Sequence, residues 1–118
     1  MRITLFRGRS IEEWKWVIGC LVINRHRESP TIVMAGGTHV PVYRDTVGQW
    51  TTFMDAKARL IFEGDIIQYG IYKYVIQFRE ETASWIAHER YEIFGDMPLT
   101  AKWEKSRNDI RIIGNIYD

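Results

Sequence analysis

The chain is poor in the residues that build metal and redox centres. Among 118 residues it has one cysteine and three histidines, and His26, His39 and His88 lie far apart in the sequence. Because a zinc site draws several such ligands from short spacings, we expect no metal and no cofactor. The single thiol, Cys20, cannot form an internal disulfide and lies in an apolar run, which predicts a small buried side chain.

Sequence motifs for catalysis and phosphate binding are also missing. Neither G-x-x-x-x-G-K-[ST] nor G-x-G-x-x-G occurs in the chain. None of the serines stands in a nucleophile elbow; they are Ser10, Ser29, Ser84 and Ser106. We therefore expect a protein that is not an enzyme and has no small-molecule substrate.

Long apolar runs are lacking. No run approaches the ~20 residues that a membrane-spanning helix needs, and residues 1–7 are too short and too interrupted by charge to form a signal peptide. We expect a soluble, cytoplasmic protein with no membrane partner.

A strong net charge of either sign is lacking too, since the formal value is +1. Residues 1–59 hold nine Lys/Arg against five Asp/Glu, and residues 60–118 hold seven against ten, so the halves carry +4 and −3. The overall charge gives no general attraction to nucleic acid or anionic lipid. The asymmetry fits complementarity within the chain or head-to-tail contact between copies.

Apolar and aromatic residues, in contrast, are plentiful, at 46% and 14%. A chain of this length buries roughly two thirds of its unfolded surface, which predicts a single domain over residues 1–118 with one core. Five tryptophans are difficult to enclose in one such core, and exposed aromatics are enriched in interfaces. We therefore expect a homo-oligomer; the alternative is a monomer with two adjoining small cores.

The stretch 60–69 consists of two short apolar runs joined by Glu63-Gly64-Asp65. Such runs predict two strands that meet at a sharp bend, where Gly64 adopts backbone angles that other residues resist. The two carboxylates are expected to accept hydrogen bonds from nearby backbone amides. A catalytic or metal-binding carboxylate pair is the less favoured alternative, because neighbouring strand residues point to opposite faces.

Alternating apolar and β-branched residues predict further short strands. These cover residues 3–7, 14–23, 31–34, 39–43, 52–54, 72–79, 83–88, 91–94 and 110–117. Residues 7–9 are expected to turn, Ser10 to cap a single helical turn, and Gly19 to mark a bulge or a close approach of another backbone. Pro41 predicts an edge strand, and residues 96–105 a short helix.

These elements predict a mainly β fold of small, strongly curved sheets, with an SH3-like barrel from about Gln49 to Trp85. The short C-terminal helix is the one helical element expected in it.

Aromatic residues alternate with lysine at Trp14-Lys15-Trp16 and at Tyr72-Lys73-Tyr74. Such a pattern can form a stacking platform for single-stranded nucleic acid, although aromatics in a small β protein are more often core residues. Arg25-His26-Arg27 is expected to be a solvated loop, with phosphate contact as the alternative.

Five segments, taken in order and spacing, resemble the YopX proteins of phages and prophages. The segments are Phe6-Arg7-Gly8-Arg9, Trp16-Val17-Ile18-Gly19-Cys20-Leu21, Thr46-Val47-Gly48-Gln49-Trp50-Thr51, Ile61-Phe62-Glu63-Gly64-Asp65-Ile66-Ile67 and Ile113-Gly114-Asn115-Ile116-Tyr117-Asp118. Two departures concern turns, since Thr52 and Ala58 stand where the family usually has glycine.

The resemblance implies an intracellular, phage-encoded, mostly β protein and supplies no catalytic residues. Two functions remain open at this point. The first is a non-catalytic binding or assembly module of a phage accessory system, and the alternative is a small nucleic-acid-binding β-barrel.

Overall fold

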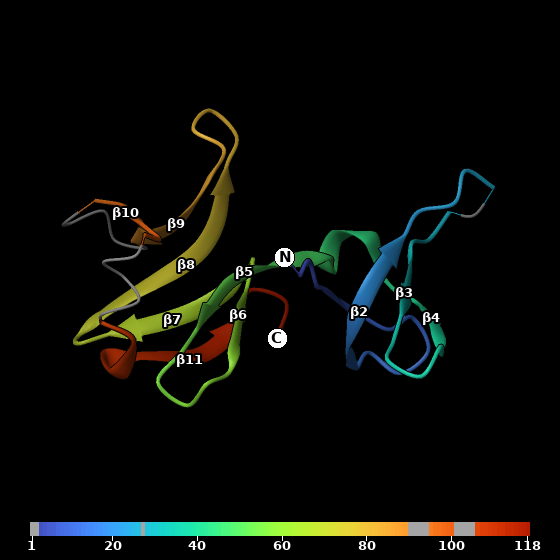
Figure 1. Cartoon of the computed structure of the whole chain (residues 1–118), viewed down its shortest axis with the longest axis horizontal. Coiled ribbons are helices and arrows are strands. Elements are labelled where there is room, and N and C mark those ends of the chain that lie inside the picture. Colours follow the sequence, from blue (N-terminus) through green and yellow to red (C-terminus); the bar gives the residue numbers. More distant parts are fainter. Residues whose placement is uncertain (1–2, 27, 90–94, 101–105) are drawn as a thin grey trace. The chain divides into compact units, whose positions relative to one another are not determined.

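The structure is a computed structural model that describes residues 3–26, 28–89, 95–100 and 106–118. The chain divides into two compact units, Met1–Trp50 and Thr51–Asp118, and its strands belong to antiparallel sheets (Figure 1). The mainly β fold is therefore confirmed. That the chain acts as a single domain over residues 1–118 stays a prediction.

Strands β1 to β4 and the first residues of β5 build the first unit, in the sheet order β4-β3-β2-β1-β5, and β5 continues into the second unit. Their bounds are Phe6–Arg9 for β1, Trp16–Val22 for β2, Thr31–Val33 for β3, His39–Pro41 for β4 and Gly48–Met54 for β5, with the 3₁₀ turn η1 at Arg44–Thr46. Pro41 lies in the edge strand, as predicted, because proline cannot donate a ladder hydrogen bond.

Two glycines allow close packing in this unit. A Cβ at Gly19 would lie 2.1 Å from the carbonyl oxygen of Val33, so the predicted close approach of a backbone is confirmed. A Cβ at Gly8 would lie 3.0 Å from Val42 Cβ. Gly8 stands inside β1, so the turn predicted over residues 7–9 was wrong; the glycine serves packing there and leaves the strand extended.

The face of β2 that carries Cys20 is exposed, so the prediction of a buried thiol was wrong. Ile18 and Val22, two residues to either side, are 40% and 46% exposed. The fully buried side chains of this unit, Ile32 and Val42, lie on the other face, since Ile32 pairs with Leu21. A unit this small builds one apolar layer, and the long apolar run of β2 therefore cannot be covered on both faces.

The second unit contains a curled five-stranded sheet with the order β10-β9-β8-β7-β11 (Figure 1), and β6 pairs with β5. The bounds are Leu60–Phe62 for β6, Asp65–Tyr69 for β7, Tyr72–Arg79 for β8, Ser84–Glu89 for β9, Met97–Pro98 for β10 and Ile110–Asn115 for β11, with the 3₁₀ turn η2 at Arg107–Asp109. Its core gathers alternate residues of these strands. The buried members are Ile61, Ile67, Tyr74, Ile76, Ala87, Leu99 and Ile110.

The predicted bend between β6 and β7 is confirmed. Gly64 has a φ of +87°, a conformation that favours glycine. Its N–H donates to the carbonyl of Ile76 at 2.8 Å, and its carbonyl accepts from the N–H of Ile116 at 3.0 Å. The backbone of one residue, Gly64, therefore connects the bend to β8 and to the C-terminal residues.

Two residues that replace the family's usual glycines adopt positive φ values. Thr52, inside β5, has a φ of 75°, and Ala58, in the loop between β5 and β6, has a φ of 60°. The N–H of Ala58 donates to the carbonyl of Asp55 at 3.0 Å. Both residues therefore keep the backbone conformation that glycine would allow, at the steric cost of a Cβ.

Residues 96–100 do not form the predicted helix. These residues are extended: Met97 pairs with Ala87 and Pro98 with Ile86, and the pair forms β10 at the edge of β9. Residues 101–105 of that helix, and the strand expected at 91–94, lie outside the described residues. The SH3-like barrel over 49–85 stays a prediction, since the curled sheet takes β11 from the C-terminus as an edge strand.

In the ranges that the structure describes, no helix has the length and apolar character needed to cross a bilayer.

Candidate binding surface

The loop between β1 and β2 is organised by Ser10. Its N–H donates to the carbonyl of Lys15 at 2.8 Å, and its carbonyl accepts from the N–H of Trp14 at 2.9 Å. The Ser10 hydroxyl accepts from the N–H groups of Glu13 and Lys15 at 3.3 and 3.1 Å. The predicted capping of one turn by Ser10 is thus confirmed.

Trp14, the last residue of this loop before Lys15, has a φ of 57°. A bulky residue in the left-handed region is strained, by roughly 1–2 kcal/mol. The hydrogen bonds around Ser10 maintain that conformation, and they present the indole with 47% of its surface exposed. Strain of this kind is concentrated at functional sites, which makes Trp14 a candidate for binding.

Trp14 belongs to an aromatic–arginine cluster on one face of the first unit. The cluster consists of Arg7, Arg9, Trp14, Trp16 and Tyr43. The Arg9 guanidinium carbon lies 5.2 Å from the ring centre of Trp14 and 4.3 Å from that of Trp16. Arg7 also lies 4.3 Å from Trp16, and the rings of Trp14 and Tyr43 are 5.4 Å apart and tilted by 59°.

The register of β1 and β2 produces this cluster. Arg9 pairs with Trp16, and Arg7 with Ile18, so their side chains share one face of the sheet. Arg9 also donates from Nη1 to the carbonyl of Trp14 at 2.8 Å. Each cation–π contact contributes about 0.5–1 kcal/mol at a surface, and together they hold the rings in place before any partner arrives.

The sequence identified Trp14 and Trp16 as a candidate platform but missed Arg9 and Tyr43. The spacing Arg7–Arg9 across a short loop from Trp14–Trp16 was the available signal, since alternate strand residues share a face. Tyr43 carried no such signal, because it reaches the cluster through the long-range bond from its N–H to the carbonyl of Arg9 at 2.9 Å.

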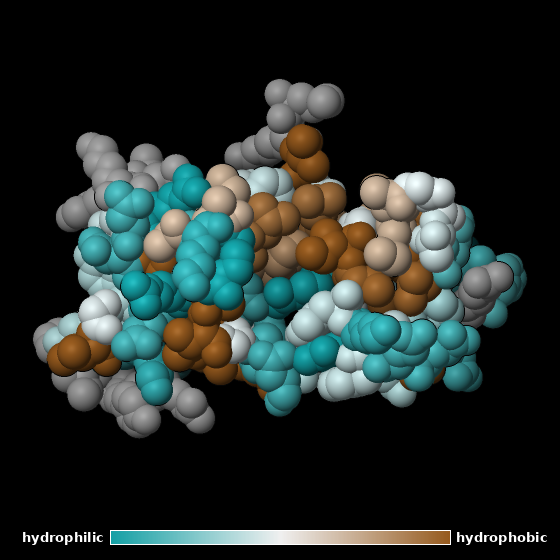
Figure 2. All heavy atoms as spheres, turned by 90° about the horizontal axis from the view of Figure 1, so that it is seen from below, coloured by the Kyte–Doolittle hydropathy of each residue, from teal (hydrophilic) through white to brown (hydrophobic). Residues whose placement is uncertain are grey.

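An exposed apolar stripe lies on β2 beside the cluster. It consists of Ile18, Cys20, Val22 and Ile23, and we call it the β2 stripe; Ile23 is 64% exposed. Ile18, Cys20 and Val22 share the face of Trp16, since they are alternate residues of one strand. Hydrophobic residues gather in places among hydrophilic ones on the face seen in Figure 2.

In the second unit the principal buried carboxylate, Asp55, is structural. It accepts from the backbone N–H groups of Lys57, Arg59 and Ile112 and from the Arg59 side chain at 2.9 Å. Burial would raise the pKa of Asp55, but these donors outweigh it and hold the pKa below its ordinary value. Arg107 Nε donates to the Asp55 carbonyl at 3.0 Å, which ties η2 to the same loop.

A second carboxylate, Asp96, binds two side chains. It pairs with Arg79, and its Oδ1 lies 2.7 Å from His88 Nδ1. Burial would raise the pKa of Asp96, but the hydrogen bonds from His88 and Arg79 dominate and lower it. The three residues attach the segment before β10 to β8 and β9.

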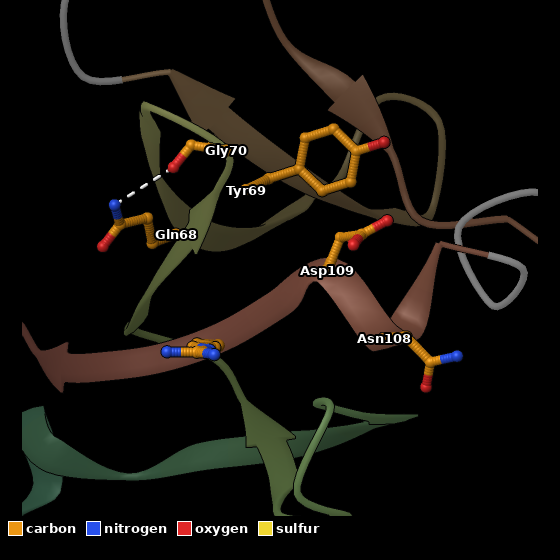
Figure 3. A pocket seen from close by; sticks show the side chains of 6 residues that line it. Gln68, Tyr69, Gly70, Asn108 and Asp109 are labelled. Carbon is orange, nitrogen blue, oxygen red and sulfur yellow. Dashed lines mark hydrogen bonds between the residues drawn. The ribbon is translucent and has the colours of Figure 1, made fainter.

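Figure 3 shows a cavity of about 500 Å³ in the second unit. Its lining residues are Gln68, Tyr69, Gly70, Asn108, Asp109 and Arg111. Gln68 Nε2 donates to the carbonyl of Gly70 at 3.1 Å, and the side chain of Asn108 points away from the others (Figure 3). Among the described residues, the lining combines the carboxylate of Asp109 and the guanidinium of Arg111 with neutral polar groups, so this hollow offers polar and charged contacts.

Asp65 confirms the structural role predicted for its carboxylate. It is buried and accepts from Phe62 N–H at 2.8 Å and from Asn115 Nδ2 at 3.0 Å, whereas Glu63 is exposed. The Asp65 carboxylate therefore bonds within the fold, and the Glu63 side chain lies at the surface. Across the described ranges, no group of three His, Cys, Asp or Glu residues could hold a metal ion.

The other residues predicted to bind a partner lie either at the surface or in the core. Arg25 and His26 are exposed, which confirms a solvated loop in the described part of that basic segment. Tyr74 is buried and Tyr72 packs against the core, so this second aromatic–lysine segment is structural. Burial, and then the charge of Glu89, raises the pKa of Tyr74.

The segments that carry the YopX resemblance meet within each unit. In the first, Phe6–Arg9 pairs with residues 16–19 and with Gly48 and Gln49. In the second, the Glu63–Asp65 bend bonds to Asn115 and Ile116. These segments therefore maintain turns and close packing, which explains their glycines without invoking catalysis.

Comparison with known proteins supports the same family. No curated protein matches the chain. The family described as YopX protein matches residues 10–118, beginning just after the Phe6–Arg9 segment. The chain therefore belongs to the YopX protein family.

Proposed function

We propose that the chain is a non-catalytic binding and assembly module that acts by self-association. Family membership supports an origin as a phage- or prophage-encoded accessory protein, working in the cytoplasm of the bacterial host. In this proposal the protein needs no cofactor, and its curved sheets, including the SH3-like barrel proposed for residues 49–85, serve as scaffolds for contact surfaces.

The observation that carries the proposal is the β2 stripe. The three aliphatic side chains and the thiol of this stripe leave apolar area in water, which favours its burial against a partner. The proposed partner that covers the β2 stripe is a second copy of the chain. Residues 1–50 hold seven Lys/Arg against four Asp/Glu and residues 51–118 hold nine against eleven, so the units carry +3 and −2 and are electrostatically complementary between copies.

Light scattering on the purified protein tests this proposal. We expect a species larger than 14.0 kDa at micromolar concentration, reduced toward that mass by Val22→Asp, because the substitution places a charge in the β2 stripe. Ala35→Asp is the matched control, since it adds the same charge to the same unit at an exposed residue between β3 and β4, outside the stripe. A mass of 14.0 kDa for the unmodified chain across micromolar concentrations would contradict self-association.

A second candidate function is binding of nucleic acid, and the aromatic–arginine cluster favours it. Exposed aromatic rings beside arginines, in a unit with a charge of +3, are suited to contact both bases and phosphates. Fluorescence anisotropy of a labelled oligonucleotide tests this function. We expect log affinity to fall linearly with log salt concentration, whereas no binding at tens of micromolar protein would exclude it.

A further inference from the structure

We propose that Trp14 and Tyr43 form the base-stacking site for single-stranded nucleic acid, an inference that rests on the second candidate function above. The backbone of Trp14 has a left-handed conformation that is unusual for tryptophan.

Trp14 occupies a backbone position that is unusual for a bulky residue. The four residues between Ser10 and Lys15 end with one in the left-handed region, where hairpin loops usually place glycine or asparagine. Trp14 is instead strained and 47% exposed. The indole contacts Arg9 and Tyr43 but is not enclosed in the core, so it presents an aromatic surface to solvent.

The rings of Trp14 and Tyr43 are held in place by neighbouring residues. Arg9 holds Trp14 twice, through the hydrogen bond from Nη1 to its carbonyl and through the guanidinium 5.2 Å from its ring. Tyr43, 43% exposed, lies 5.4 Å from the same ring, and its hydroxyl donates to the carbonyl of Ile11 at 3.5 Å. Two ordered, half-exposed rings lose little conformational freedom when a ligand stacks on them.

Two exposed aromatic rings beside arginines suit the bases of a single strand. Every nucleobase has a flat π face that stacks on aromatic side chains, and an unpaired strand exposes both faces of its bases. A duplex hides those faces within its own stack. Arg44 follows Tyr43 directly and is exposed, and its guanidinium donates to the carbonyl of Glu28 at 3.3 Å. A cation therefore adjoins Tyr43 in the sequence and is available for contact with a phosphate.

The test compares Trp14→Gly with the unmodified chain in titrations of a labelled oligothymidine of about 16 nucleotides, the upper end of the site size for small β folds. Glycine removes the indole and its contacts with Arg9 and Tyr43 but also relieves the left-handed strain, so we expect the variant to fold, which its urea midpoint checks. We expect its affinity to fall by roughly 5- to 150-fold, the range for the loss of one stacked base, with the slope against salt unchanged.

Phe78→Ala is the matched control, because Phe78 is a 43% exposed aromatic residue of the second unit; it should leave affinity unchanged. Arg44→Ala should reduce the salt slope by about one and weaken binding to all sequences alike. A duplex of the same length should compete weakly.

Several outcomes would overturn the inference, and they can be told apart. Equal affinity of Trp14→Gly and the parent would reject the stacking site while leaving nucleic-acid binding intact, and equal competition by duplex would do the same. Absence of any binding by the parent would reject the nucleic-acid function and the site together. A change in oligomeric mass of Trp14→Gly without a change in affinity would assign the ring to a protein contact.

Discussion

Asn115 donates from its side-chain amide to the buried carboxylate of Asp65 at 3.0 Å, across a sequence separation of 50 residues. The other oxygen of that carboxylate accepts from the N–H of Phe62 at 2.8 Å. The last strand therefore fixes the central bend of the second unit, and both groups belong to the segments that identify the family.

Asn115→Ala should destabilise the protein by about 1–3 kcal/mol, because it removes a donor from a buried carboxylate. Urea unfolding followed by tryptophan fluorescence measures the change. Asn108→Ala is the control, since Asn108 is exposed in η2 of the same unit; it should change stability by less than ~0.5 kcal/mol. Equal effects of the two substitutions would show that the Asp65–Asn115 bond contributes nothing specific.

Ala58→Gly should stabilise the protein by about 0.5–1 kcal/mol. Glycine relieves the roughly 1–2 kcal/mol that a Cβ costs in the left-handed region, and part of the gain is lost to the greater freedom of the unfolded chain. Ala56→Gly, two residues earlier in the same loop and without a positive φ, should instead destabilise the protein. Thermal unfolding of both variants checks the signs, and a loss of stability with Ala58→Gly would contradict the account of this turn.

Gly19→Ala should destabilise the first unit by several kcal/mol, since its Cβ would lie 2.1 Å from the Val33 carbonyl oxygen and would force β2 and β3 apart. Gly114→Ala is the comparison, because its Cβ would lie at an ordinary 3.5 Å from Asp118 Oδ2. Circular dichroism and urea titration measure both variants. Equal tolerance of the two alanines would refute the close packing of β2 and β3.

Acid should weaken the fold through Asp55, whose pKa is lowered in the folded state from its ordinary value of 3.8. The sign follows from linkage: the stabilisation is fully present above the unfolded pKa and is lost as the pH falls through the folded one. Asp55→Asn should therefore cost about 1–3 kcal/mol at neutral pH and progressively less below the ordinary value. A difference between variant and parent that stays constant with pH would contradict this.

The sequence was sufficient for features governed by local chemistry. Glycine at Gly64, alternation in residues 72–79 and proline at Pro41 each predict their structure from steric or periodic rules, and all three predictions are confirmed. The same logic identified Asp65 as a residue that bonds to backbone.

Features that depend on which elements cover one another could not be predicted in this way. The apolar run around Cys20 predicted burial, but the first unit builds its apolar layer on one face of β2. Tyr43 joins Trp14 through strand pairing that no local pattern encodes. Pro98 suited a first helical turn equally well, yet pairing with β9 extends it.

The most direct test of self-association through the β2 stripe uses Cys20, the chain's one thiol and an exposed residue at the centre of that stripe. The measurement is the rate of Cys20 alkylation by a thiol reagent in large excess, over protein concentrations from nanomolar to tens of micromolar. The proposal predicts that the rate falls as concentration rises and recovers with Val22→Asp but not with Ala35→Asp. A rate that is the same at every concentration would contradict burial of the β2 stripe between copies.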